Sequence, residues 1–265
     1  MDYQNCSALV VGGGSGIGAE LALALGEKGC RLILTGRTRS RLEDSASRIR
    51  RTGAGVQVMP CDVTDRRAVQ SLARETGPVD ILVYCAGGPV AGTDCPVPAS
   101  SDEFFTSMAD YTLAAVAEDD FNAIFNTNFH GGRHCIQAML PLMQKAGRGR
   151  IIVVTSKSGM LNNAIVPGMG PYAVAKAALS RMVGALAFEL MCEGSPVIIN
   201  GISPGMIAVD FHRKLPEDER QGYGKPADVR PVFFRALEAP EGGHIYSRET
   251  GKTWEDELRS GLLPD

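Results

Sequence analysis

The residues best suited to chemistry are Tyr172 and Lys176, four positions apart, with Ser156 sixteen residues before the tyrosine. Positions i and i+4 share one face of a helix, so the phenol and the ammonium would enter one site together. A free tyrosine, with a pKa near 10, is a poor acid–base catalyst at neutral pH, and a nearby ammonium is expected to lower that pKa. The three side chains predict a proton-transfer site in which Ser156 holds a substrate oxygen against the phenol.

A glycine-rich turn follows the first apolar run of the chain. Residues 11–18 read Val-Gly-Gly-Gly-Ser-Gly-Ile-Gly, and an apolar helical pattern begins directly after them. In this strand–turn–helix context, glycines let the backbone approach a pyrophosphate, whose charge is stabilised by the helix N-terminus. The alternative is a purely structural turn. The predicted cofactor contacts are Gly12, Gly14, Ser15, Gly16, Ile17 and Gly18.

The end of the next strand bears on the choice between NAD and NADP. An acidic residue near this point takes the ribose hydroxyls of NAD, whereas an arginine accommodates the 2′-phosphate of NADP. Here the sequence is Thr35-Gly36-Arg37, which lacks the carboxylate and offers a guanidinium. We therefore expect NADP(H) to be favoured over NAD(H). The alternative is that Arg37 only opens a basic, exposed helix.

Two further strand ends carry candidate cofactor contacts. Asp62-Val63 follows the third expected strand, where Asp62 could bond the adenine and Val63 could flank it. The alternative for Asp62 is a helix N-cap, for which Thr64 or Asp65 would also serve. Ala86-Gly87 follows the fourth strand, where small residues would let the backbone lie close to the cofactor.

The composition excludes several classes of function. Charged residues make up 22% of the 265 residues, and the net charge of −3 gives no electrostatic reason to expect nucleic acid or an anionic membrane as a partner. Seven scattered cysteines without a C-x-x-C pair indicate reduced thiols and a cytoplasmic protein. No apolar stretch approaches 18 residues, so no membrane span is expected. His130 and His134 share a helix face, but no third ligand is evident, so we expect no metal.

Short apolar runs alternate with longer amphipathic segments along the whole chain. This alternation predicts an α/β fold with a doubly wound parallel sheet of about seven strands and helices on both faces. The expected strands are 8–11, 31–35, 56–59, 81–84, 151–155, 197–200 and, more weakly, 243–246. The expected helices are 16–28, 38–51, 65–76, 119–146, 171–193 and 226–238.

No linker, internal repeat or low-complexity run divides the chain, so residues 1–265 are expected to form a single domain. Residues 88–118 interrupt the alternation, and so long an excursion is usually functional or mobile. Together with 157–171 and 206–222, they are the expected substrate loops. The tail 247–265 would pack on a neighbouring subunit or lie on the surface.

Taken together, these motifs resemble the short-chain dehydrogenase/reductases in their single-domain form, which have the Rossmann fold. The resemblance covers roughly residues 7–246 and rests on motifs that occur in family order and near family spacing. They are the glycine turn, Asp62-Val63, Ala86-Gly87, Asn128, Ser156, Tyr172-x-x-x-Lys176 and Pro204-Gly205.

The resemblance implies a role for each matching residue. Tyr172 would exchange the proton at the substrate oxygen, and Lys176 would lower its pKa and bind the nicotinamide ribose. Ser156 would orient the carbonyl or hydroxyl, and Asn128 would hold a water that links Lys176 to solvent. Cofactor contacts with the carboxamide end of the nicotinamide would come from Pro204, Gly205 and Ile207.

The chain also departs from the family pattern. Val11 replaces a threonine, and Tyr84-Cys85 replaces Asn-Asn, so side-chain hydrogen bonds that brace the cofactor turn are expected to be lost. The loop after Ser156 is longer than usual, which leaves Ser158 as its rival. Val209 replaces a threonine that commonly binds the carboxamide, and the usual Asp-Gly-Gly ending is absent.

These features predict an NADP-dependent oxidoreductase that interconverts a carbonyl and a secondary alcohol on a small or medium, largely apolar substrate. Met160, Met169 and Met206 would flank the pocket, together with Leu161, Val166 and Phe211. The alternative is that they are ordinary core or subunit-interface residues. The alternatives are a non-redox biosynthetic enzyme on this scaffold, such as a cyclase or isomerase, and a catalytically silent cofactor-binding protein. The resemblance further implies a homo-oligomer, a tetramer or dimer, joined through the long helices near 119–146 and 171–193.

Overall fold

The computed structural model describes residues 1–89, 111–160, 168–209 and 221–259, together with 100, 103, 106 and 216–218. Most of the excursion at 88–118 and parts of the other two substrate loops therefore lie outside the described residues. Leu161, Val166 and Phe211, expected at the pocket, lie outside them as well.

A parallel sheet forms the centre of the described structure, with the strand order β3-β2-β1-β4-β5-β6-β7. The chain starts in the middle, moves outward to β3, and returns to β4 on the other side of β1. Ligands of such sheets bind outside the carboxyl ends of the strands, near the point where this direction reverses. The strands are β1 Ser7–Val11, β2 Arg31–Thr35, β3 Val56–Val58, β4 Ile81–Tyr84, β5 Gly149–Val154, β6 Val197–Ser203 and β7 Ile245–Ser247.

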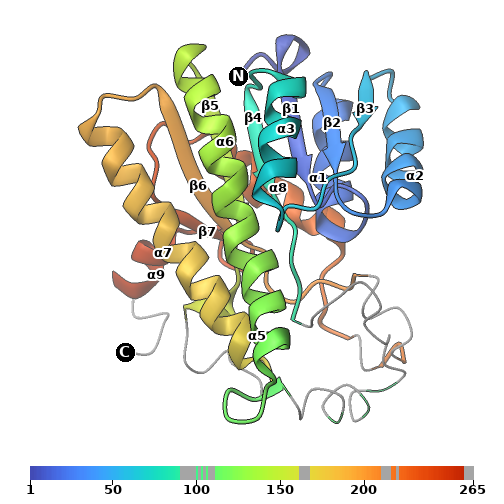
Figure 1. The fold of residues 1–265 in the computed structure, drawn as a ribbon, viewed down its shortest axis with the longest axis vertical. Coiled ribbons are helices and arrows are strands. Elements are labelled where there is room, and N and C mark those ends of the chain that lie inside the picture. The colour runs from blue at the N-terminus through green and yellow to red at the C-terminus, as the bar shows by residue number, and fades with distance from the viewer. Residues whose placement is uncertain are drawn as a thin grey trace.

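Helices cover both faces of this sheet (Figure 1). One face is covered by α1 (Gly16–Glu27), α2 (Arg39–Arg50) and α8 (Arg230–Glu238). The other is covered by α3 (Arg66–Thr76), α6 (Gly131–Lys145) and α7 (Gly170–Cys192). The short helix α5 (Glu118–Phe125) leads into α6 through a π-helical turn, and α9 (Trp254–Arg259) follows β7.

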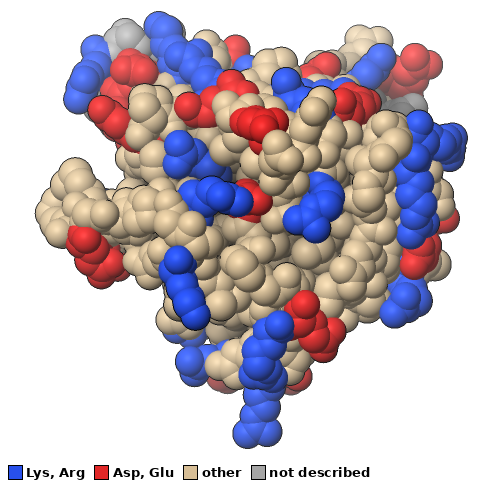
Figure 2. All heavy atoms as spheres, turned by 90° about the horizontal axis from the view of Figure 1, so that it is seen from above, with Lys and Arg blue, Asp and Glu red and all other residues tan. Residues whose placement is uncertain are grey.

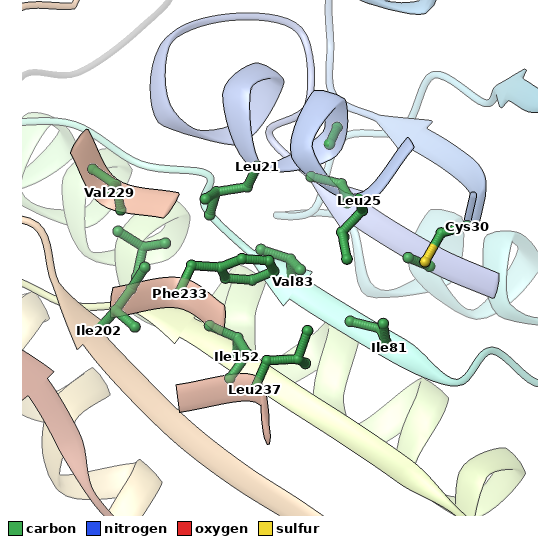
Figure 3. Close-up of a cluster of buried hydrophobic side chains, with 14 of the residues drawn as sticks. Leu21, Leu25, Cys30, Ile81, Val83, Ile152, Ile202, Val229, Phe233 and Leu237 are labelled. Atoms are coloured by element: carbon green, nitrogen blue, oxygen red, sulfur yellow. The ribbon is translucent and has the colours of Figure 1, made fainter. Parts of the chain in front are cut away.

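Side chains of the central strands alternate between two hydrophobic cores, one on each face of the sheet. In β1, Ala8 and Val10 belong to one core, and Leu9 and Val11 belong to the other. In the core of Figure 3, Phe233 of α8 lies between the helices and the sheet. Burial of one such side chain stabilises the fold by about 1.5–3 kcal/mol. Both cores hold the strand ends, and thus the site, in place.

The doubly wound sheet expected from the sequence is confirmed, with small differences in element bounds. The segment expected as one helix over 119–146 is α5, a π-helical turn at Asn126–His130, and α6. The tail, which was expected to pack on a neighbouring subunit or lie on the surface, contains α9, whose Trp254 is buried. Tail burial within the same chain argues against a purely surface position for residues 247–259.

Charges of both signs are interspersed on the face that Figure 2 shows, so no single-sign field covers it. Within the described part of the chain, every helix is too short or too polar to cross a bilayer.

Candidate active site

Ser156 lies just beyond the carboxyl end of β5, where a short 3-10 turn at Lys157–Gly159 begins. Its Oγ accepts a hydrogen bond from the backbone N–H of Ser158 at 3.3 Å. Gly159 closes the turn against α7, because a Cβ at this position would lie 2.5 Å from backbone atoms of Lys176 and Ala177. The Ser-x-x-Gly spacing therefore fixes the serine against the helix that carries the tyrosine.

Tyr172 and Lys176 lie one turn apart on α7, as their spacing predicted. The Ser156 hydroxyl hydrogen-bonds the Tyr172 phenol, so the structure brings the expected serine and tyrosine together. The Lys176 Nζ lies 5.5 Å from the centroid of the phenol ring and donates to the Val154 carbonyl at 3.0 Å. The three side chains converge from β5 and α7 at the carboxyl edge of the sheet.

The acid–base state of this cluster differs from the sequence expectation. Burial raises the pKa of Tyr172 above its ordinary value, and the hydrogen bond with Ser156 offsets only part of this effect. Burial also lowers the pKa of Lys176 to about 8. The lowering of the tyrosine pKa expected from Lys176 is not present in the protein alone, where desolvation of the phenolate has the largest effect.

Asn128 occupies the π-helical turn between α5 and α6, and its side chain is completely buried. Its Nδ2 donates to the carbonyls of Ile124 and Gly88, both at 2.9 Å. Its Oδ1 has no hydrogen-bond partner, which is costly for a buried polar atom. Gly87 is required beside it, because a Cβ there would lie 2.2 Å from Oδ1. A π turn of this kind frequently marks a functional site.

The glycine turn between β1 and α1 forms an open cradle. Gly12 and Gly16 have positive φ angles of 82° and 52°, and a Cβ on Gly12 would lie 2.8 Å from the Ala86 nitrogen. Gly18 is needed for close packing, since its Cβ would meet the Gly12 carbonyl oxygen at 2.2 Å. Ser15 is the N-cap of α1 without a side-chain capping bond, so the helix N-terminus is left for an anion. These residues fit the pyrophosphate of a dinucleotide.

One basic side chain, that of Arg41, starts beside this cradle, and a second basic residue, Arg37, follows strand β2. A Cβ on Gly14 would lie 3.3 Å from the Cβ of Arg41, so Arg41 of α2 starts directly beside the turn. Arg37 is exposed after β2, next to Gly36. Ile17 packs partly buried against the core under α1. Sequence reasoning assigned Arg41 only to a basic helix; its i+4 spacing from Arg37 was the available signal.

Asp62 and Val63 lie after β3, and the structure resolves the alternative for Asp62. The N-cap of α3 is Asp65, whose Oδ1 accepts from the N–H groups of Arg67 and Ala68. Asp62 instead accepts from the backbone N–H and hydroxyl of Thr64 at 2.9 and 2.8 Å, and it remains exposed. Val63 is buried in the core beneath α3 and α6. The Asp62 side chain is thus exposed after β3 and does not serve as the N-cap of α3.

Tyr84 and Cys85, which stand where the family pattern has Asn-Asn, make hydrogen bonds of their own. The buried Tyr84 hydroxyl donates to the carbonyl of Thr127, which directly precedes Asn128. The Cys85 sulfur accepts from the backbone N–H of Gly18 in the cofactor turn. Each replacement therefore braces the site through a different contact. Val11 has its side chain in the core.

The turn after β6 lies beside the glycine cradle. Gly205 has a positive φ of 68°, and the following Ile207 is buried and bridges to Gly224. Val209 packs against Gly16, where a Cβ would lie 3.2 Å from its Cγ1. The predicted contacts Pro204, Gly205 and Ile207 therefore lie on the same edge of the sheet as the cradle and as Ser156, Tyr172 and Lys176.

Sequence reasoning missed two charged residues at this edge, Arg248 and Glu249. They follow β7, and the Glu249 carboxylate pairs with Lys157, directly after Ser156. The absence of the usual Asp-Gly-Gly ending was the feature of the sequence that could have drawn attention to them.

The two histidines considered for metal lie on α6 and its preceding turn, with ring centroids 6.2 Å apart. His134 Nδ1 lies 3.1 Å from the Val63 carbonyl oxygen. Among the described residues, no three His, Cys, Asp or Glu side chains gather as a metal site would require.

Comparison with known proteins agrees with this geometry. Residues 7–220 match the short chain dehydrogenase family. The chain is 30% identical over 257 residues to a glycine betaine reductase of Emericella nidulans, covering 91% of this chain and 18% of that protein. It is 28% identical to an uncharacterised oxidoreductase of Staphylococcus aureus, covering 88% of this chain and 91% of that protein.

Solved structures show the same architecture. A putative short-chain alcohol dehydrogenase from Sinorhizobium meliloti superposes with a TM-score of 0.75 at 26% identity, covering 92% of this chain and 94% of that one. A variant of the actinorhodin polyketide ketoreductase, solved with NADPH, superposes with a TM-score of 0.75 at 23% identity, covering 93% and 97%. The chain belongs to the short-chain dehydrogenase/reductase family. It is an oxidoreductase of the kind that binds a nicotinamide cofactor.

Proposed function

We propose that this protein is an NADP-dependent oxidoreductase that interconverts a carbonyl and a secondary alcohol, with Tyr172 as the acid/base. The observation that carries the proposal is the convergence of Ser156, Tyr172 and Lys176 at the edge where the glycine cradle lies. An orphaned buried oxygen on Asn128 adds a fourth polar group that awaits a partner.

The cofactor, when bound, supplies or accepts the hydride at the substrate carbon. Gly12, Gly16 and the N-terminus of α1 would hold its pyrophosphate, and the turn after β6 would receive its nicotinamide end. The other turn residues and strand ends complete its binding surface: Gly14, Ser15, Ile17, Gly18, Arg37, Asp62, Val63, Ala86, Gly87, Lys176, Pro204, Gly205 and Ile207.

The side chains of this chain perform the proton transfer. Ser156 donates a hydrogen bond to the substrate oxygen and holds it near the phenol. Tyr172 gives its proton to that oxygen during reduction, and the Lys176 ammonium stabilises the phenolate that forms. The orphaned Asn128 Oδ1 binds a water through which the proton is replaced. Held geometry lowers the barrier by on the order of 7–11 kcal/mol, and acid catalysis contributes ~10²–10⁴-fold.

The preference for NADP rests on the strand end after β2. Gly36 supplies no carboxylate for the ribose hydroxyls, and Arg37 lies exposed beside it. Arg41 begins next to Gly14, which adds a second cation near the adenosine side of the cradle. A 2′-phosphate is therefore better matched than a free 2′-hydroxyl.

The substrate is proposed to be small or medium in size and largely apolar. Met160 ends the turn after Ser156, Met169 precedes α7 and Met206 follows Gly205, and all three are partly or largely exposed. Leu113, at the end of the excursion, packs against Gly170 at the start of α7, so this loop borders the site. The names of the relatives, a glycine betaine reductase and a polyketide ketoreductase, are compatible with carbonyl reduction.

Assembly as a homo-oligomer in the cytoplasm completes the proposal. The outer face of α7 exposes Val174 by 41%, Phe188 by 63% and Met191 by 68%, and a second copy of this helix would cover them. Size-exclusion chromatography with light scattering tests whether the protein is a dimer or tetramer.

Titration with NADPH and NADH, followed by nicotinamide fluorescence and thermal stabilisation, tests the cofactor. We expect tight NADPH and weak NADH binding, with ~2.7 kcal/mol of added stability at a hundredfold excess over the dissociation constant. An Arg37→Gln variant should weaken NADPH roughly tenfold and leave NADH unchanged. Equal affinity for both cofactors in the wild type would contradict the NADP assignment.

A carbonyl screen then separates the proposal from its rivals. Absorbance of NADPH should fall in step with alcohol formation. Product without NADPH consumption would favour a cyclase or isomerase, and tight binding without turnover would favour a silent cofactor-binding protein.

A further inference from the structure

Three neighbouring strands, β5, β6 and β7, end in charged or turn residues that contact one another. The Lys157 ammonium, directly after Ser156, pairs with the Glu249 carboxylate after β7. The Arg248 guanidinium, next to Glu249, donates through Nε to the Pro204 carbonyl after β6. The backbone N–H of Arg248 also donates to the Ser203 carbonyl at 3.0 Å.

These side chains lie directly over the turn at Gly205. An added Cβ on Gly205 would lie 2.6 Å from Glu249 Oε1 and 3.2 Å from Arg248 Nη2. The guanidinium also borders Gly224, whose Cβ would meet Arg248 Nη1 at 3.1 Å. The contacts thus link the serine segment, the turn after β6 and the bridge between Ile207 and Gly224.

We propose that Lys157, Arg248 and Glu249 form a charged tie that positions the Ser156 hydroxyl relative to the turn at Pro204-Gly205. They are positioning residues, because none of them belongs to the proton-transfer cluster. This inference rests on the proposed function, in which Ser156 orients the substrate oxygen and the turn receives the nicotinamide end.

The ion pair of the tie is partly exposed, so breaking it should affect the position of Ser156 more than the stability of the fold. The side chains of Lys157 and Glu249 are exposed by 30% and 37%, and exposed ion pairs contribute little to folding. Breaking the pair should therefore shift Tm by no more than about 2 °C. Small displacements of a positioning group, by contrast, change turnover strongly.

The test compares Glu249→Gln, Lys157→Met, the double variant and the conservative Lys157→Arg. Arg148→Met is the matched control, because Arg148 forms an ion pair with Asp80 away from the site. Turnover is measured with saturating NADPH and the best substrate among acetophenone, cyclohexanone, benzaldehyde and 2-octanone.

Each single variant should lower kcat about 5–20-fold, with the NADPH dissociation constant within about twofold of the wild type. The double variant should lose no more than the worse single variant, because both break one contact. Lys157→Arg should keep at least a third of the activity, roughly, since it retains the charge. Single variants within twofold of the wild type, or additive losses in the double variant, would overturn the proposal.

Hydrogen exchange gives a readout that needs no turnover. In Glu249→Gln, amides of 156–160 and 204–208 should exchange about 3–10-fold faster than in the wild type, and Arg148→Met should leave them unchanged. Unchanged exchange at these amides in Glu249→Gln would overturn the tie. If the wild type reduces no carbonyl while exchange responds as expected, the proposed function fails and the tie stands.

Discussion

Two groups of polar side chains at opposite edges of the sheet differ in their hydrogen-bond partners. At the amino edge, Asp80 is saturated: it accepts from the N–H and hydroxyl of Ser7 at 2.8 and 3.0 Å and pairs with Arg148. At the carboxyl edge, buried polar atoms of Thr35, Asn128 and Ser203 have no partner. The groups around Asp80 satisfy one another, whereas these three atoms are left without a protein partner.

The pKa values follow the same division. Burial opposes ionisation of Asp80, yet the hydrogen bonds from Arg148 and Ser7 outweigh it and hold the pKa of that carboxyl below its ordinary value. At the carboxyl edge, burial prevails and lowers the pKa of Lys176 to about 8. The comparison of Asp80 with Lys176 shows that ionisable groups are buried without fully compensating partners where cofactor and substrate would bind. Such perturbed pKa values are typical of functional sites.

The largest expected effect comes from removing the catalytic hydroxyl. Tyr172→Phe should lower kcat by ~10²–10⁴-fold, because the substrate oxygen loses its acid. NADPH binding and Tm should change little, since the ring and its packing remain. Steady-state kinetics and fluorescence titration measure the two quantities. If Tyr172→Phe keeps roughly a tenth of the wild-type rate or more, Tyr172 is not the acid of the reaction.

A pH profile tests the state of Lys176. Its cation is present below the pKa of about 8 and is lost above it, while the raised pKa of Tyr172 keeps the phenol protonated through this range. The kcat/KM of carbonyl reduction should therefore fall about tenfold per pH unit above that value. Flat rates from about pH 7 to 9.5 would show that the ammonium is not needed.

The smallest effect on activity should come from the amino edge. Asp80→Asn should lower the free energy of unfolding at neutral pH by about 1–3 kcal/mol, because charged hydrogen bonds are lost. The folded-state pKa of Asp80 is depressed, so its contribution is present above the ordinary pKa and is lost as the pH falls through the folded value.

The difference in unfolding free energy between the wild type and Asp80→Asn should therefore be largest near pH 6 and shrink below about pH 4. Urea unfolding at several pH values measures it, and kcat should stay within about twofold of the wild type. A large loss of activity without loss of stability would erase the contrast between the two edges.

The motifs and the strand pattern were sufficient to predict the doubly wound sheet. Buried strands such as Ile81–Tyr84 are continuous apolar runs, and their bounds match the structure. The π turn at Asn126–His130 could not be predicted from the sequence, because its residues are of types that also occur in an ordinary α-helix. Likewise, α9 was missed because its short, acidic sequence shows no amphipathic period, and only Trp254 anchors it.

The sequence by itself determined which residues could bind a dinucleotide and transfer a proton, because glycine turns and i, i+4 pairs are local patterns. Tertiary structure decided how these groups are tuned. Desolvation, which depends on the packed environment, raised the pKa of Tyr172 instead of lowering it. Contacts between segments far apart in the sequence also depend on the tertiary structure: Tyr84 hydrogen-bonds Thr127, and Lys157 pairs with Glu249. Partners so far apart along the chain meet only when the parallel strands bring their carboxyl ends to one edge.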